Sequence, residues 1–300
     1  MTLDWLRGTA TALVTPFRDD DTIDTDALAR LVNYQIDGGV RILVPVGTTG
    51  ESATTTSEED QLIVRTVVAA AAGRARVIAG IGSNNTAVAI ANGRRAREAG
   101  ADAFLAVAPY YNKPTQAGLF AHYSAIAAAH PDVPIVIYNV PGRTVTNIAA
   151  STCLRLAREV DNIVAVKEAS GNFSQIMEIL AGKPDDFAVI SGDDATTLPL
   201  IALGAVGVIS VVSNQAPRHF SDLVTAALEG RWSEARALHY QLLPLMEGNF
   251  TETSPGPVKA ALAMMGIAEE RLRLPLVPVE ESTREAMRGW LVELGLLPEG

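Results

Sequence analysis

Cysteine, lysine and histidine are scarce in this 300-residue sequence, which has one, four and four of them. A disulfide needs two cysteines, so Cys153 excludes an internal disulfide and any metal site built from several thiolates. We interpret it as a small thiol that is buried or partly buried. The histidines include no HExxH-type pair, which leaves a zinc site with little support. We therefore predict no metal and no metal-dependent chemistry.

Basic residues are outnumbered by acidic ones, and long apolar runs are missing. The formal net charge of -10 argues against nucleic acids and anionic membranes as partners, because both are bound through clustered basic residues. No apolar run approaches the ~18 residues that a membrane span requires. Residues 1–17 also lack a basic segment followed by a long apolar stretch. We expect a cytoplasmic protein that acts on small molecules.

Hydrophobic residues make up 48% of the chain, enough for a large core, and they recur in one alternating pattern. Near-continuous apolar, β-branched runs predict strands that are covered on both faces. These runs are residues 9–17, 40–46, 76–81, 103–108, 133–138, 163–166, 187–190 and 206–212. Amphipathic segments between them predict helices, and several follow Thr, Ser or Asn residues that can cap a helix. They cover residues 26–37, 57–72, 86–99, 116–129, 151–158 and 172–180.

Eight such units fit a closed α/β barrel better than an open sheet. We predict a (β/α)8 TIM barrel over residues 1–225, with a C-terminal helical extension over residues 226–300. Catalytic groups in this fold lie at the carboxyl ends of the strands. The predicted strand ends carry VGTTGES (46–52), APYYNKP (108–114), YNVPGRT (138–144), VKEASGN (166–172), SGDDATT (191–197) and GVISVVSN (207–214).

Lys167 is the one lysine that follows a predicted buried strand. Lys113 and Lys183 lie in loops and Lys259 in a predicted helix, where we expect them to be solvated. Burial disfavours an ammonium group, and a neutral amine can attack a keto group to form an imine. The alternative is that Lys167 forms a structural ion pair with a buried carboxylate.

Hydroxyl groups and one guanidinium accompany Lys167 at the predicted strand ends. Tyr138, Tyr111, Thr48 and Thr49 supply hydroxyls that could carry protons to and from an imine, although aromatic residues at a barrel rim are often only packing. Arg143 suits two-point capture of a carboxylate, or a salt bridge at the rim. The SGDD and GVIS segments would let a ligand approach the backbone, but they contain no basic residue for a phosphate.

Together and in order, GTTGES, PYYNKP, YNVPGRT, KEASGN, SGDD and GVISV resemble the dihydrodipicolinate synthase family of pyruvate-dependent aldolases, which includes N-acetylneuraminate lyase. The resemblance extends over nearly the whole chain. It implies a barrel with a C-terminal helical region, assembled as a homotetramer of tight dimers, without a metal or organic cofactor. It also implies that pyruvate forms an imine on Lys167 and that the resulting enamine attacks L-aspartate 4-semialdehyde.

The resemblance also implies roles for other residues. Thr48, Tyr111 and Tyr138 would form a hydroxyl relay, with Tyr111 reaching into the neighbouring subunit's site and Tyr138 exchanging protons with the imine. Thr48 and Thr49 would hold the pyruvate carboxylate. Arg143 would bind the carboxylate of the semialdehyde.

Gly192 and Ile209 would line the pyruvate end of the site through their backbone. Related lyases that act on sialic acid or keto-deoxy sugar acids have GSTGE in place of GTTGE and lack the arginine, so both positions favour the synthase. A barrel that has lost catalysis and only binds a ligand is the other alternative.

Two segments depart from the family pattern. Ser57, Asp60 and Val88 stand where members that are inhibited by lysine have two histidines and a glutamate. Without that glutamate the ammonium of a bound lysine lacks a charge partner, so we predict weak or absent inhibition by lysine. The second departure is ETSPGP at residues 252–257, which we expect to lie away from the mouth of the barrel.

Overall fold

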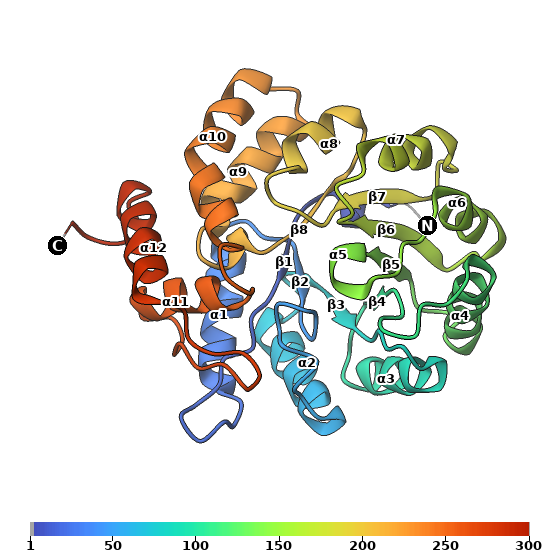
Figure 1. Ribbon diagram of the computed structural model, residues 1–300, viewed down its shortest axis with the longest axis horizontal. Helices are drawn as coiled ribbons and strands as arrows, with labels where there is room; N and C mark the ends of the chain where they lie inside the picture. The colour runs from blue at the N-terminus through green and yellow to red at the C-terminus, as the bar shows by residue number, and fades with distance from the viewer. Residues whose placement is uncertain (1–2, 300) are drawn as a thin grey trace.

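The computed structural model describes residues 3–299, which form a closed barrel of eight parallel strands surrounded by helices (Figure 1). Each strand pairs with the next one in the chain, and β1 closes the barrel by pairing with β8 in parallel. The strands are β1 (Gly8–Ala12), β2 (Ile42–Val44), β3 (Arg76–Gly80), β4 (Ala103–Val107), β5 (Ile135–Asn139), β6 (Ile163–Glu168), β7 (Ala188–Ser191) and β8 (Gly207–Ser210). The predicted TIM barrel is confirmed.

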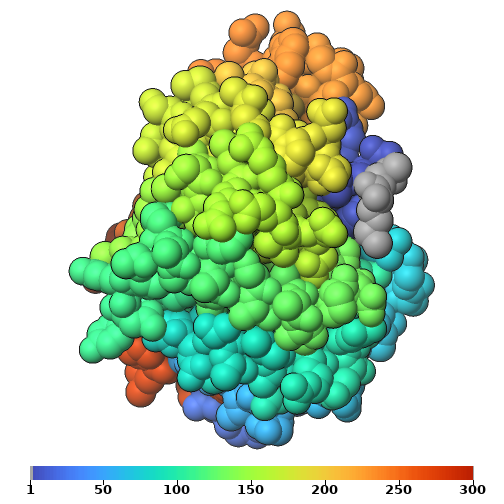
Figure 2. All heavy atoms as spheres, turned by 90° about the vertical axis from the view of Figure 1, so that its right-hand side faces the viewer, coloured from blue at the N-terminus to red at the C-terminus, as the bar shows by residue number. Residues whose placement is uncertain are grey.

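The helices follow the strands in chain order, with three of them after α9 at the carboxyl end. They are α1 (Thr25–Asp37), α2 (Ser57–Ala71), α3 (Thr86–Glu98), α4 (Gln116–Ala129), α5 (Pro141–Thr144), α6 (Ala150–Glu159), α7 (Phe173–Gly182), α8 (Thr197–Leu203), α9 (Pro217–Leu228), α10 (Trp232–Gly248), α11 (Gly256–Met264) and α12 (Glu281–Glu293), with short 3-10 turns at Asp4–Leu6 and Val212–Asn214. Figure 2 shows one side of the molecule, where the colour of the surface changes in chain order from cyan at the bottom, through green and yellow, to orange at the top.

Several of the expected helices begin at side-chain caps, as the sequence indicates. The Thr56 hydroxyl accepts a hydrogen bond from the Glu59 backbone, and the Glu59 carboxylate accepts one from the Thr56 backbone, which completes a capping box at the start of α2. At the starts of α3, α4 and α7 the side chains of Asn85, Thr115 and Asn172 each accept one hydrogen bond from a backbone N–H of the helix. Helices α5 and α8 were not predicted, because four and seven residues are too few to show a helical period.

The first predicted strand was too long. The chain leaves β1 after Ala12, and Phe17 lies in an isolated antiparallel bridge with Ile23 instead of continuing the barrel. Pro16, which cannot donate a backbone hydrogen bond, separates the two paired regions. This turn carries Phe17 toward the C-terminal region, where it contacts two cations that are described below.

Three apolar clusters make up the core. One fills the barrel interior, a second lies between the strands and helices α1 to α7, and a third joins β8 to helices α8 to α12. The third cluster crosses residue 225, the predicted end of the barrel region, which lies inside α9. Within residues 3–299, none of the helices is long and apolar enough to cross a membrane.

Candidate active site

The residues singled out in the sequence gather at the carboxyl ends of the strands, as the parallel barrel requires. Tyr138 and Lys167 are the next-to-last residues of β5 and β6. Gly192 directly follows β7, and Ile209 lies in β8. Thr48 and Thr49 lie in the loop after β2, Tyr111 in the loop after β4, and Arg143 in α5 after β5. One edge of the barrel therefore carries all eight predicted site residues.

Lys167 points into the barrel because side chains alternate along a strand. The next residue, Glu168, faces the other way and accepts hydrogen bonds from Asn139 and from the Ser170 backbone. Only 5% of Lys167 is exposed, and burial lowers its pKa to about 8, against the opposing attraction of Asp194. In the part of the chain that the structure describes, no carboxylate lies within ion-pair distance of its amine. The structural ion pair considered for Lys167 is absent there.

Tyr138 stands beside Lys167 because the two residues are register partners in β5 and β6. The Lys167 Nζ atom lies 4.3 Å from the centroid of the Tyr138 ring. Burial raises the pKa of Tyr138 to about 12, while Arg143 and Thr48 act in the opposite direction. The phenol therefore remains protonated at neutral pH and can donate a proton to a group bound at the amine.

Gly192 leaves space for the lysine side chain. A Cβ atom at this position would lie 3.0 Å from Lys167 Cε, 3.1 Å from Lys167 Cγ and 2.7 Å from Ala169 Cβ. Real Cβ atoms make almost no contacts as short as the one with Ala169, and the two contacts with Lys167 are unusually tight. A side chain at this position would therefore require Ala169 to move and Lys167 to shift by a few tenths of an ångström. The SGDD segment thus has a steric role in addition to the predicted backbone contact with a ligand.

A cavity of about 380 Å³ opens at this edge of the barrel. Thr48, Tyr138 and Arg143 contribute to its lining. Lys167 is not a lining residue, so Tyr138 connects the cavity to the buried amine. This arrangement offers an entry for a small molecule whose carboxylate could be met by the exposed Arg143.

The other predicted residues lie outside the cavity lining. Thr49 is buried beneath its loop, and Ile209 belongs to the apolar cluster in the barrel interior with Tyr138. Tyr111 is 88% exposed and has a positive φ of 72°. A single chain therefore unites Lys167 with Tyr138 and Gly192, but leaves Tyr111 at the surface.

The expectation that Lys259 is solvated was wrong. Lys259 is 1% exposed and forms an ion pair with Glu51, whose side chain is equally buried. Its helix α11 is apolar on nearly every face, from Pro257 to Met264. Such a pattern is typical of a buried helix, and a lysine inside it requires a partner, so this signal was present in the sequence.

The expectation that residues 252–257 lie away from the mouth was also wrong. Thr253 and Ser254 line the cavity together with Thr48 and Arg143, and so do Pro275 and Leu276. The C-terminal region folds back onto the barrel and supplies one wall of the cavity. Sequence patterns report local structure, so they did not reveal this long-range contact.

Asp194 is a further buried group that the sequence reasoning missed. One of its carboxylate oxygens accepts hydrogen bonds from the Val211 and Val212 backbones at 3.1 and 2.7 Å. Burial raises the pKa of Asp194 to about 6. The sequence feature that could have revealed it is the pair of adjacent acidic residues directly after a predicted strand. Acidic side chains are rarely buried inside a protein without a partner.

The chemistry available at this edge is that of an amine. Across residues 3–299, no group of three or more His, Cys, Asp or Glu side chains could hold a metal ion. A buried amine with a lowered pKa can attack a carbonyl carbon, and a neighbouring phenol can shuttle the protons. The geometry therefore favours imine formation with a small keto acid.

Comparison with known proteins agrees with this geometry. The family model described as the dihydrodipicolinate synthetase family matches residues 5–293. The chain belongs to this family. A curated 4-hydroxy-tetrahydrodipicolinate synthase from Koribacter versatilis is 51% identical over 293 residues, which are 97% of each chain.

Solved structures of other family members have the same fold. The dihydrodipicolinate synthase from Acinetobacter baumannii, described as chloride inhibited and complexed with pyruvate, has a TM-score of 0.94 and 40% identity, and the match covers 97% of this chain and 99% of that one. The enzyme from Cyanidioschyzon merolae, described as having lysine bound, has a TM-score of 0.95 and 41% identity over 98% and 99% of the two chains. The family resemblance seen in the six motifs is thus confirmed.

The contact at Gly192 gives a first prediction. We expect Gly192→Ala to slow adduct formation between the lysine amine and pyruvate by on the order of tenfold, since the lysine would have to shift by a few tenths of an ångström and small errors in the position of a reacting group are costly. Borohydride reduction followed by mass spectrometry measures the adduct. Gly289→Ala in α12 is the control, because a Cβ there meets no atom within 4 Å. An unchanged rate in Gly192→Ala would refute the steric role.

Proposed function

We propose that this chain is a 4-hydroxy-tetrahydrodipicolinate synthase, a lyase that condenses pyruvate with L-aspartate 4-semialdehyde on the way to diaminopimelate and lysine. The observation that carries the proposal is the buried Lys167 amine, which has a lowered pKa and lies 4.3 Å from the Tyr138 ring. The name of the relative that is 51% identical supports the choice of reaction.

In the proposed mechanism, the neutral Lys167 amine attacks the keto carbon of pyruvate. Loss of water from the resulting carbinolamine gives an imine, and loss of a methyl proton gives an enamine. The enamine carbon then forms a bond to the aldehyde carbon of the semialdehyde, and the aldehyde oxygen takes up a proton to become a hydroxyl. The semialdehyde's own amine displaces Lys167 as the ring closes, so the lysine is released unchanged. Tyr138 exchanges the protons in these steps.

The proposed substrate contacts rest on the family resemblance and, for Thr48 and Arg143, also on the cavity lining. Thr48 and Thr49 hold the pyruvate carboxylate, and Gly192 and Ile209 line that end of the site. Arg143, which is exposed at the cavity mouth, binds the carboxylate of the semialdehyde with its planar guanidinium. The pyruvate named with the solved relative from Acinetobacter baumannii is consistent with this choice of first substrate.

The proposed assembly is a homotetramer of tight dimers in the cytoplasm. Tyr111 links this assembly to catalysis in the proposal. Its side chain is 88% exposed and does not line the cavity of its own chain. In the proposal it joins Thr48 and Tyr138 of a neighbouring copy to complete the hydroxyl relay. The molar mass in solution, measured by light scattering, tests this assembly.

The function is tested by trapping the imine. We expect borohydride with pyruvate to modify Lys167 in the unaltered protein, and Lys167→Arg to lose both trapping and turnover, because a guanidinium stays protonated and cannot act as a nucleophile. Peptide mapping identifies the modified residue.

The same protein is then assayed with aspartate semialdehyde and separately with sugar acids. Turnover of a sugar acid alone would reject the synthase but retain the imine chemistry. An unmodified Lys167 peptide would instead indicate a barrel that only binds its ligand.

The rate of imine formation should increase with pH. Because burial lowers the pKa of Lys167 to about 8, the neutral amine becomes the main form above that value. We expect the rate of trapping at excess pyruvate to rise with pH up to about 8 and then to level off. A rate that continues to rise to about pH 10, where an ordinary lysine titrates, would contradict a lowered pKa.

Inhibition by lysine should be weak. The Val88 side chain offers no charge to the ammonium of a bound lysine, and a charge that is desolvated without a partner costs several kcal/mol. We expect no inhibition of turnover by submillimolar lysine and a gain of inhibition in Val88→Glu. Submillimolar inhibition of the unaltered protein would contradict this prediction.

A further inference from the structure

A second buried lysine, Lys259, contacts the loop that carries Thr48 and Thr49. Lys259 in α11 donates a hydrogen bond to Glu51 Oε1 and another, of 2.7 Å, to the Arg271 carbonyl. The other Glu51 oxygen, Oε2, accepts a hydrogen bond of 3.1 Å from the Arg273 backbone. Both charged side chains are 1% exposed, so their attraction is little screened by water. The pair joins residues that are 208 positions apart.

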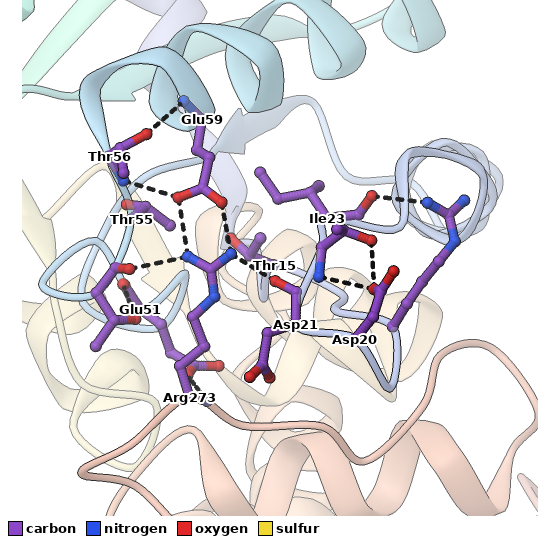
Figure 3. Close-up of polar contacts among 12 residues, drawn as sticks. Thr15, Asp20, Asp21, Ile23, Glu51, Thr55, Thr56, Glu59 and Arg273 are labelled. Atoms are coloured by element: carbon purple, nitrogen blue, oxygen red, sulfur yellow. Dashed lines mark hydrogen bonds and ion pairs between the residues drawn. The ribbon is translucent and has the colours of Figure 1, made fainter.

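Arg273 forms a second link between the same two regions (Figure 3). Its guanidinium donates a hydrogen bond of 2.9 Å to the Thr54 carbonyl and bonds of 2.9 and 2.5 Å to the Glu59 carboxylate. It also lies 4.4 Å from the centroid of the Phe17 ring, and Lys259 Nζ lies 4.3 Å from the same centroid. The C-terminal segment is thus fixed to both ends of the chain that runs from Glu51 to α2.

The loop held by these contacts has an unfavourable backbone conformation. Val46 and Glu51, which lie on either side of the GTTG segment, have positive φ values of 58° and 57°. A β-branched residue in this region is unusual, and such a conformation persists only where surrounding contacts enforce it. On the barrel side, the Thr15 hydroxyl donates a hydrogen bond of 2.7 Å to the Gly50 carbonyl. On the other side, the Glu51 carboxylate is held by its ion pair with Lys259.

The wall of the cavity depends on the same anchor. Thr253 and Ser254 precede Lys259 in the chain, Pro275 and Leu276 follow Arg273, and all four line the cavity with Thr48. A displacement of Glu51 relative to Lys259 would therefore move a substrate-binding loop and the facing wall apart.

We propose that Glu51 and Lys259 are positioning residues, which fix the Thr48–Thr49 loop against the C-terminal wall of the cavity and so set the affinity for the carboxylate of the keto acid. The inference rests on the proposed function, because pyruvate is the ligand of that loop. Glu51 is among the residues that line the cavity, whereas Lys259 is not. The covalent step at Lys167 does not require the pair.

The test is a set of variants assayed with pyruvate. Lys259→Met keeps the length and apolar stem of the side chain but leaves a buried carboxylate without its cation. We expect the KM for pyruvate to rise on the order of tenfold or more, since small displacements of binding groups have effects of this size. At saturating pyruvate, borohydride should still modify Lys167 fully. Lys183→Met is the matched control, because that lysine donates only one long bond of 3.4 Å to the Pro184 carbonyl.

Two further variants make the result independent of the folding of Lys259→Met. Glu51→Gln keeps the shape and hydrogen-bonding capacity of the side chain and should also raise the KM for pyruvate. The double variant, Lys259→Met with Glu51→Gln, contains no unpaired charge and should be less impaired than the sum of the single effects. Thermal unfolding is recorded for every variant.

The outcomes separate the inference from the function. If the melting temperature falls while the folded variants keep the KM of the unaltered protein, the pair is only structural and the inference is overturned. If the unaltered protein forms no adduct with pyruvate, the proposed function fails instead. A raised KM with complete trapping at saturation and a smaller effect in the double variant supports the positioning role.

Discussion

The desolvation of one ammonium group inside a closed barrel is the constraint on which the rest of the site depends. Placing Lys167 in β6 removes its amine from water, and the parallel register then fixes what surrounds it: Tyr138 from β5 on one side and Ile190 from β7 on the other. Gly192 follows because the lysine side chain occupies the space of a Cβ. An amine with a lowered pKa is thus a product of strand order and burial.

The two buried lysines differ in what lies next to the amine. Burial lowers the pKa of both side chains. At Lys259 the Glu51 carboxylate opposes this effect by direct contact, and the resulting ion pair joins two distant segments of the chain. At Lys167 the opposing carboxylates are those of Asp194 and Asp193, and neither lies within ion-pair distance in the described part of the chain. The partner, and not burial alone, therefore distinguishes the two lysines.

The sequence was sufficient for the features that are local in the chain. The barrel followed from eight apolar runs alternating with capped amphipathic segments, and the strand-end motifs located Lys167, Tyr138, Thr48 and Gly192, because a parallel barrel brings all strand ends to one edge. The sequence was insufficient for contacts between distant segments. The Glu51–Lys259 pair, the Arg273 contacts and the cavity wall at Ser254 arise from how the C-terminal helices fold back, which no periodicity encodes. The role proposed for Tyr111, which is exposed at the surface, likewise requires another copy of the chain.

The long separation of Glu51 from Lys259 has a consequence for biosynthesis. During translation the loop after β2 leaves the ribosome 208 residues before the lysine that neutralises its carboxylate. All eight strands, with Tyr138 and Lys167 among them, are synthesised before α11, which carries the partner of Glu51. The wall that Thr253, Ser254, Pro275 and Leu276 supply is therefore the last part of the cavity to be synthesised.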